Sequence, residues 1–306
     1  MPTNIIFLIL PQMHLLDLAG PDQVFHESIG YGADIKLSYC SYENNISTST
    51  NIPFGRLNHF TEIKTKPGDY IFIPGANVSF LLSKKLKEQK ALFKWVVDCY
   101  NNGAVVCSVC TGAFFLAQTG LLNGRECTTH WKRTKELQEK FPAVDVVENI
   151  LFTEAERVFT SAGVTAGIDM ALYILGKLKD DNFSYKVARE LVIYVRRQGN
   201  EAQQSIFMNY RNHIHSGVHN VQDYIQENIS SKLTLNELAD VAFMSSRNLT
   251  RIFKKEIGIS VNEYINLVRK GRLAELMKNP DITRAQMAKQ CGLTSQRHVS
   301  RLIQSL

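Results

Sequence analysis

The chain has 306 residues, of which 44% are apolar and 21% charged, and 35 basic against 29 acidic side chains give a net charge of +6. This length allows about two domains of roughly 150 residues each, and the composition excludes a disordered, collagen-like or coiled-coil protein. No apolar run approaches the roughly 18 residues of a membrane span, so we expect no membrane partner. The first residues lack the basic region of a secretory signal, and we therefore expect a cytoplasmic protein.

The positive charge is concentrated near the C-terminal end. Residues 217–306 carry 13 Lys and Arg against 8 Asp and Glu, a net +5, whereas residues 1–216 carry 22 against 21. Such asymmetry is typical of a module that faces nucleic acid, with an ordinary basic surface as the alternative.

Six cysteines are too few for a disulfide framework. Cys107 and Cys110 have the spacing of a redox pair, but residues three apart on a strand point to opposite faces, so we do not favour that pairing. No second Cys/His pair follows at zinc-finger spacing. We therefore expect neither a metal nor a cofactor.

Strand and helix signals alternate through the first two thirds of the chain. The expected strands are 5–10, 35–40, 69–73 and 104–109, with further short strands between 144 and 160. The expected helices are 20–30, 92–100, 111–118 and 168–179, the first of them opened by Pro21. This alternation indicates a parallel sheet covered by helices, an α/β fold.

The remainder of the chain has helical periodicity only. The expected helices are 219–228, 235–241, 247–257, 261–277, 284–290 and 296–303. We assign residues 1–200 to a first domain, 201–217 to a polar linker and 218–306 to an all-α second domain.

An internal repeat marks the second domain. Ala239, Met244, Ser245 and Ser246 recur 49 residues later as Ala288, Leu293, Thr294 and Ser295. Leu249, Arg251 and Phe253 recur 50 residues later as Val299, Arg301 and Ile303. We place the one-residue slip just after the turn, where insertion costs least. Each unit reads as a short helix, a tight turn, a Ser/Thr N-cap and a second helix, which is the helix-turn-helix pattern.

The second helix of each unit is suited to double-stranded DNA. Ser245 or Ser246 caps the first of these helices, and its N-terminal end is free to approach phosphates. Arg and Asn side chains can read guanine and adenine edges in the major groove. The candidate DNA-binding residues are Ser246, Arg247, Asn248, Arg251, Lys254, Lys255, Gln296, Arg297, His298 and Arg301. The intervening helix of about 17 residues spans about 25 Å, enough to hold two reading helices near one turn of DNA apart.

Residues 219–303 resemble the AraC/XylS-type DNA-binding domain, which carries two helix-turn-helix units on a linker helix. The stretch from Phe253 to Ser260 is similar to that family's signature after the first reading helix, and Val261 stands where the family usually has proline. The family also continues beyond the position of Leu306. The resemblance therefore implies a C-terminally short domain, in which we expect the first unit to carry most of the DNA affinity.

The first domain contains a cysteine at a sharp turn. The segment 104–116 reads as a strand, a turn and a helix, and Cys110 lies at the turn. A helix N-terminus favours thiolate, and the Thr111 N–H would point at an anion held there. Asp17 follows the first strand, and we expect it to meet Cys110 at the carboxyl edge of the sheet, with His130 joining them.

Five motifs in this domain together resemble the ThiJ/PfpI superfamily, with its class I glutamine amidotransferase-like fold. They are Leu15–Phe25, Ile73–Gly75, Val109–Ala113, Thr129–Trp131 and Thr160–Asp169. In that superfamily the cysteine at this strand-to-helix turn, which we call the elbow, is paired with a carboxylate, here Asp17. A Gly-Gly after the third strand usually supplies oxyanion-type donors, and here it is Gly75-Ala76. The resemblance implies a ligand site formed by Asp17, Gly75, Ala76, Cys110, Thr111 and His130.

The order of the two domains resembles that of GlxA-type transcriptional regulators of the AraC family. This resemblance implies a homodimeric, sequence-specific DNA-binding regulator whose first domain senses a small-molecule effector and is not an enzyme. The first domain is also similar to isonitrile hydratase, which has the same Asp and Cys arrangement. Two alternatives thus stay open, a PfpI-like hydrolase or hydratase using Cys110, and a redox sensor that oxidises Cys110.

Overall fold

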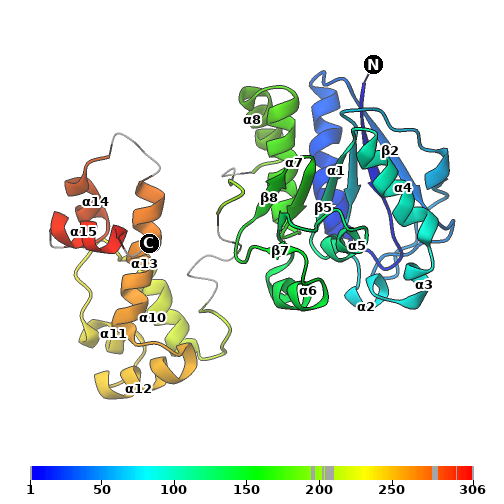
Figure 1. Cartoon of the computed structure of the whole chain (residues 1–306). Helices are drawn as coiled ribbons and strands as arrows, with labels where there is room; N and C mark the ends of the chain where they lie inside the picture. Colours follow the sequence, from blue (N-terminus) through cyan, green and yellow to red (C-terminus); the bar gives the residue numbers. More distant parts are fainter. Residues whose placement is uncertain are drawn as a thin grey trace. The chain divides into compact units, whose positions relative to one another are not determined.

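The computed structural model describes residues 2–193, 197–201, 203, 210–277, 282–293 and 295–304. The chain divides into two compact units, Met1–Gln203 and Gln204–Leu306 (Figure 1). The boundary between them lies within the stretch 201–217 that the sequence indicates as a linker. None of the described helices has both the length and the apolar character that crossing a bilayer requires.

A mostly parallel sheet forms the centre of the first unit. Among the described residues it has seven strands in the order β3-β2-β1-β4-β5-β9-β8, and β8 is antiparallel to β9. The strands are β1 (Thr3–Leu8), β2 (Ile35–Ser41), β3 (Asn58–His59), β4 (Tyr70–Ile73), β5 (Val105–Val109), β8 (Phe152–Ala155) and β9 (Val158–Ser161). A separate parallel pair is formed by β6 (Glu126–Cys127) and β7 (Asp145–Val146).

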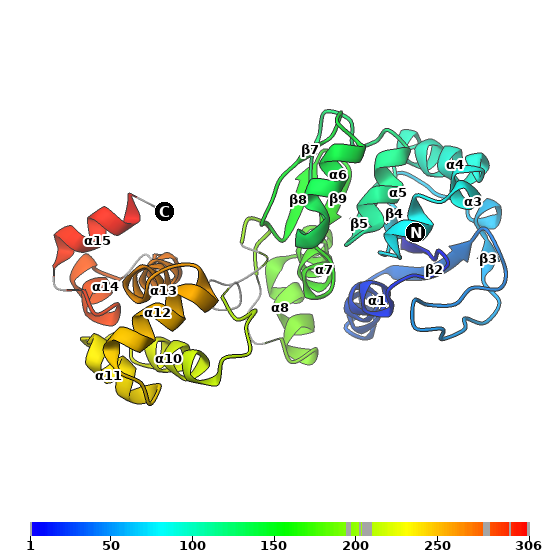
Figure 2. The same cartoon turned by 90° about the horizontal axis from the view of Figure 1, so that it is seen from below.

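Helices cover both faces of the sheet, so its central strands are buried on both sides. One face is covered by α1 and α7, and α4 and α5 lie on the other (Figure 2). Every residue of β4 and β5 is buried, which is why these strands read as continuous apolar runs.

The larger helices of this unit are α1 (Leu15–Gly30), α4 (Lys90–Asn101), α5 (Gly112–Gln118), α6 (Thr134–Lys140), α7 (Thr165–Leu178) and α8 (Asp181–Glu190). Single turns are formed by α2 (Val78–Leu81), α3 (Lys84–Lys87), η1 (Phe60–Glu62) and η2 (Trp131–Arg133).

The start of α1 differs from the sequence prediction. The helix begins at Leu15 and contains Pro21, whereas we expected Pro21 to open it. A proline inside a helix removes one N–H donor, and the residue four positions before it loses that partner. Here that residue is Asp17, in the first turn. The earlier start places the Asp17 side chain on the helix rather than in the loop before it.

The strand order reverses between β1 and β4, because β2 lies on one side of β1 and β4 on the other. In open α/β sheets ligands bind at the carboxyl edge beside such a reversal. Three connections meet there, after β1, after β4 and after β5. They carry Asp17, Gly75 and Cys110, so the topology brings the expected ligand-binding segments to one edge.

The second unit is all helical in its described residues. Its helices are α10 (Ser216–Glu227), α11 (Leu235–Val241), α12 (Ser246–Ile257), α13 (Val261–Leu276), α14 (Arg284–Gln290) and α15 (Gln296–Ile303). The prediction of an α/β domain followed by a helical domain with helix-turn-helix units is confirmed.

Two apolar clusters organise the second unit, one for each half of the repeat. The first contains Leu249 and Phe253 of α12 together with Tyr264 of α13. The second contains Val299 and Leu302 of α15 together with Leu273 at the far end of α13. The long helix α13 therefore joins two small cores, as expected of a linker helix between two units.

Candidate functional site

Cys110 lies at the turn between β5 and α5, in a left-handed backbone conformation with φ of +56°. Its N–H donates to the Ser161 carbonyl oxygen at 2.9 Å, and its own carbonyl oxygen accepts from Thr129 Oγ1 at 2.8 Å. A non-glycine residue in this region is strained and needs support from its surroundings. The two hydrogen bonds fix the turn from both sides.

Two glycines allow the close packing around this cysteine. A Cβ atom on Gly163 would lie 2.1 Å from Cys110 Cβ and 2.8 Å from its Sγ. A Cβ on Gly112 would lie 2.2 Å from the Ile73 carbonyl oxygen. Larger residues at these positions would displace the turn, so the glycines are a packing requirement of the elbow.

Asp17 is held from two sides in the first turn of α1. Its side chain is 1% exposed, and Oδ1 accepts a hydrogen bond of 2.7 Å from the Val164 N–H. The other oxygen, Oδ2, lies 3.3 Å from Nδ1 of His14. The hydrogen bond to Asp17 raises the pKa of His14, although burial opposes it. Asp17 thereby has one oxygen committed to the backbone and one directed to a titratable side chain.

The structure brings Cys110 to Asp17, as the sequence predicts. Cys110 Sγ and an Asp17 carboxylate oxygen lie within 4.8 Å of each other, and Cys110 is 4% exposed. Burial, followed by the charge of Asp17, raises the pKa of Cys110, and the Thr111 N–H opposes this only in part. The helix N-terminus does favour the thiolate through the Thr111 N–H, as expected, but its effect on the pKa of Cys110 is the smaller one. Desolvation and a neighbouring carboxylate outweigh the helix end.

The Gly75-Ala76 loop is hydrogen-bonded to Thr111, the residue that follows Cys110 at the elbow. Thr111 Oγ1 accepts from the Ala76 N–H at 3.0 Å and donates to the Ala76 carbonyl oxygen at 2.7 Å. A Cβ on Gly75 would lie 2.5 Å from Asp17 Oδ2, so glycine keeps this loop against the carboxylate. The Ala76 N–H is thus already paired, and it is not a free oxyanion-type donor.

His130 does not hydrogen-bond Cys110 or Asp17 among the contacts of the described residues. Its Nδ1 accepts from the Lys132 N–H at 3.3 Å, and its ring stacks on Trp131. Burial lowers the pKa of His130, and the charge of Asp17 acts on it only from a distance. The histidine beside the carboxylate is His14, which the sequence analysis missed. The missed signal is its position three residues before Asp17, a spacing that places two side chains together at a helix start.

The second candidate site is the exposed face of α12. Ser245 is its N-cap and accepts from the Asn248 N–H at 3.3 Å, whereas Ser246 Oγ donates to Asn236 Oδ1 at 2.7 Å. Of the two serines proposed as caps, Ser245 has that role. Ser245 and Arg247 are both exposed, so this end of the helix is open to solvent.

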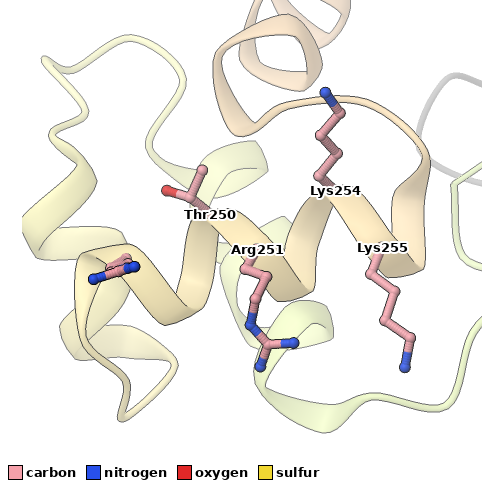
Figure 3. A pocket seen from close by; sticks show the side chains of 5 residues that line it. Thr250, Arg251, Lys254 and Lys255 are labelled. Atoms are coloured by element: carbon pink, nitrogen blue, oxygen red, sulfur yellow. The ribbon is translucent and has the colours of Figure 1, made fainter.

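Cationic side chains line a shallow hollow along this face. Figure 3 shows Thr250 and Lys254 pointing to one side of α12 and Arg251 and Lys255 to the other. Arg247 completes the lining, and these five side chains are all exposed. Arg251 also donates to Asn248 Oδ1 at 3.0 Å, which couples a cationic and an amide side chain of the expected reading face.

The second reading helix, α15, begins in the same way. Ser295 caps it by accepting from the His298 N–H at 3.3 Å, and Gln296, Arg297 and Arg301 are exposed. The caps Ser245 and Ser295 are 50 residues apart, although the turn residues Met244 and Leu293 are 49 apart. The one-residue slip therefore falls between the turn and the cap, just after the turn as predicted, and Ser245 corresponds to Ser295 rather than to Thr294. The extra position is Thr294, which lies outside the described residues.

Comparison with known proteins identifies both units. Residues 3–177 match the DJ-1/PfpI family. The chain belongs to that family. Residues 225–266 match the AraC family of bacterial regulatory helix-turn-helix proteins. The protein thus joins a DJ-1/PfpI unit to an AraC-type helix-turn-helix unit, which confirms the two resemblances seen in the sequence.

Several curated relatives of this DJ-1/PfpI chain are regulators. It is 30% identical over 197 residues to the HTH-type transcriptional regulator GbdR of Pseudomonas aeruginosa, covering 63% of this chain and 53% of GbdR. It is 22% identical over 204 residues to the regulator GlxA of Rhizobium meliloti, covering 67% and 63%. The isonitrile hydratase of Pseudomonas putida is 29% identical over 180 residues, covering 58% and 73%. The chain spans about half the length of GbdR.

Solved structures agree with the fold of the DJ-1/PfpI unit. The crystal structure of an AraC family transcriptional regulator from Pseudomonas putida aligns with a TM-score of 0.54 at 17% identity. It covers 62% of this chain and all of that one. At this identity the likeness supports the fold alone.

Proposed function

We propose that this protein is a transcriptional regulator in which the AraC-type unit binds double-stranded DNA and the DJ-1/PfpI unit senses a small molecule. The observation that carries the DNA-binding part is the exposed row of cationic side chains on α12, a helix that begins with an open, serine-capped end. Phosphate contacts supply much of the affinity for DNA, and side chains near the start of a reading helix reach base edges.

The proposed DNA contacts are assigned by their place on the two reading helices. On α12 they are Ser246, Arg247, Asn248, Arg251, Lys254 and Lys255, and on α15 they are Gln296, Arg297, His298 and Arg301. Lys254 and Lys255 lie in the last turn of α12, so they suit phosphates. Arg247, Asn248 and Arg251 lie nearer its start, where they suit bases.

The sensing part of the proposal rests on the geometry of the elbow. A small effector held beside Cys110, Thr111 and the Gly75 backbone would bias the arrangement of a homodimer in the cytoplasm, and so the DNA affinity. Support for access and association comes from exposed apolar side chains next to the site residues. Leu16 adjoins Asp17, Trp131 adjoins His130, and Val164 donates to the Asp17 carboxylate.

The enzymatic and redox alternatives have less support. Both need a reactive thiolate, and oxidation follows thiolate character and exposure. Cys110 is almost fully buried, and its surroundings raise the pKa of the thiol. The Ala76 N–H, a candidate donor to a developing oxyanion, is bonded to Thr111. We therefore interpret the elbow as a binding site rather than a catalytic one.

The DNA-binding proposal is tested on duplexes selected from a random-sequence pool with the whole protein. We expect fluorescence anisotropy to show affinity that falls steeply as salt is raised, since bound phosphates release counterions. Arg251→Ala should weaken binding to the selected duplex by about 1–3 kcal/mol and relax the base preference at one position.

The matched control is Arg272→Ala, because it removes the same charge from α13, where Arg272 pairs with Glu275 of the same helix and lies outside the reading face of α12. We expect this variant to bind with nearly unchanged affinity. Equal losses from the two variants would reduce the effect to net charge and refute the assignment to α12. Failure to enrich any duplex, with no binding at low salt, would refute DNA binding altogether.

A further inference from the structure

Three metal-binding side-chain atoms gather at the carboxyl edge of the sheet. They are His14 Nδ1, an Asp17 carboxylate oxygen and Cys110 Sγ, and all lie within 4.8 Å of one another. The spacing of donors around a tetrahedral ion is about 3.5 Å, given bonds of about 2.0–2.3 Å. His14 and Asp17 are already at 3.3 Å, so a small movement of side chains would complete the geometry.

The surroundings orient these donors as the outer partners of a metal site would. The Val164 N–H occupies Asp17 Oδ1 and leaves Oδ2 facing His14. The backbone N–H of His14 donates to the Gly75 carbonyl oxygen at 2.7 Å, which fixes the chain at His14 against the Gly75 loop. Partners of this kind fix the direction of ligating groups and contribute to metal affinity.

Two glycines, Gly75 and Gly163, lie against the donor atoms, and a side chain at either position would collide with a donor. A Cβ at Gly75 would lie 2.5 Å from Asp17 Oδ2, and one at Gly163 would lie 2.8 Å from Cys110 Sγ. Of the two side chains, that of His14 is the one that reaches solvent. It is 35% exposed, whereas the Asp17 side chain is 1% exposed. An ion could therefore enter past the imidazole and reach the two buried donors.

We propose that His14, Asp17 and Cys110 form a binding site for a borderline divalent cation of the Zn²⁺ class, with a fourth position open to water or an effector. A mixed set of sulfur, nitrogen and oxygen donors selects such ions over Mg²⁺ and Ca²⁺, which prefer oxygen alone. On binding, the cation displaces the thiol proton to solvent, and the thiolate becomes its ligand.

This inference reverses the expectation of a protein without metal. That expectation considered only cysteines and histidines at finger-like spacing, and it did not include His14. The inference deepens the proposed sensing function and rests on it for any effect on DNA. Binding of the ion itself is independent of DNA and can be measured without it.

The test uses Co²⁺ as the probe, with the whole reduced protein and no DNA. We expect one equivalent to bind per chain, with a sulfur-to-cobalt charge-transfer band in the near ultraviolet, and Zn²⁺ to displace it. Cys110→Ser should abolish the band. His14→Ala should weaken Co²⁺ binding by at least about tenfold, since even an outer-shell change costs that much.

Two matched controls separate this site from other donors. Cys107→Ala removes a buried cysteine of β5, and His26→Gln removes an exposed histidine of α1, so both should keep the band and the affinity. Tryptophan fluorescence of each variant checks that the fold is intact. A wild-type protein without the band, or a band that survives in Cys110→Ser, overturns the inference.

The effect of the metal ion on DNA binding is measured separately, with the selected duplex. A change in duplex affinity with Zn²⁺ that is lost in His14→Ala supports a metal effector. A protein that binds the duplex but not Co²⁺ overturns the metal site while leaving DNA binding intact. A protein that binds Co²⁺ at one equivalent but no duplex supports the metal site and refutes the proposed function.

Discussion

Cys110 is constrained in three ways at once, by its backbone conformation, by burial of its thiol and by close packing. Its backbone is left-handed, its thiol is buried beside a carboxylate, and its Cβ is pressed against Gly163. Strain of this kind persists only where the surrounding structure enforces it, and it concentrates at functional sites. The hydrogen bonds from Thr129 and to Ser161 supply that enforcement at Cys110.

Gly163→Ala tests how closely the elbow is packed. Because the new Cβ would lie 2.1 Å from Cys110 Cβ, at a φ of +87°, we expect the first unit to lose about 2–4 kcal/mol of unfolding free energy. Urea unfolding followed by tryptophan fluorescence measures this loss, since both tryptophans, Trp95 and Trp131, lie in that unit. The control is Gly30→Ala, where a Cβ would meet nothing within 4 Å. A Gly163→Ala protein as stable as the control would contradict the packing argument.

The sequence predicted part of this site and missed the rest for a physical reason. Motif order placed Asp17 and Cys110 at one sheet edge, because strand ends converge in a parallel sheet. His130 was expected on the same ground, but side-chain direction is set by local bonds, and its Nδ1 is turned to the Lys132 N–H. His14 could have been found from its three-residue spacing to Asp17, had the helix been started at Leu15.

At the scale of elements, the helices of the second unit were predictable and the details of its turns were not. The bounds expected for α11, α14 and α15 agree with the structure, because each has a Ser or Thr cap before an apolar stripe. The turns differ in chemistry. Phe243 takes a φ of +54° in the first turn, where Gly292 takes +60° in the second. A Phe in that conformation gives no turn signal in the sequence.

His213, just before α10, and His219, within α10, stack on each other and form hydrogen bonds through both ring nitrogens. His219 accepts from Arg211 at Nδ1 and donates from Nε2 to the His213 carbonyl oxygen. His213 accepts from the His215 N–H and donates to Gln222 Oε1, and the two rings are 4.1 Å apart. Each ring thus uses one nitrogen as an acceptor, which a protonated imidazole no longer offers.

This pair predicts that acid weakens the packing of residues 210–215 on α10. Burial lowers the pKa of His213, the neighbouring His219 and Arg211 act in the same direction, and Gln222 and Glu256 oppose them. The folded unit therefore binds this proton less readily than the unfolded chain. Stability is full above the ordinary histidine pKa of about 6.5 and falls as the pH drops through it.

Hydrogen–deuterium exchange of peptides covering 210–227, corrected for intrinsic rates, measures the effect. We expect faster exchange at pH 5.5 than at pH 7.5, and His213→Gln should reduce that difference. Equal protection of the wild-type peptides at the two pH values would refute the role of the histidine pair.

At the scale of the whole molecule, charge is divided unevenly between the two units. Residues 217–306 hold a net +5 of the chain's +6, and the DJ-1/PfpI unit is nearly neutral. Under the proposed function, long-range attraction to DNA would come from the helical unit, because Lys and Arg side chains attract the phosphate backbone over long range.

The two reading helices should share DNA binding unequally. On α12 four cationic side chains border one hollow, whereas the exposed cations of α15 are Arg297 and Arg301, on a helix four residues shorter. We expect Arg251→Ala to weaken binding to the selected duplex severalfold more than Arg297→Ala at matched salt. Interference footprinting should show contacts in two successive major grooves, about 10 base pairs apart, with Arg297→Ala erasing the weaker set. Comparable losses from the two variants, or contacts confined to one groove, would contradict a two-helix reader led by α12.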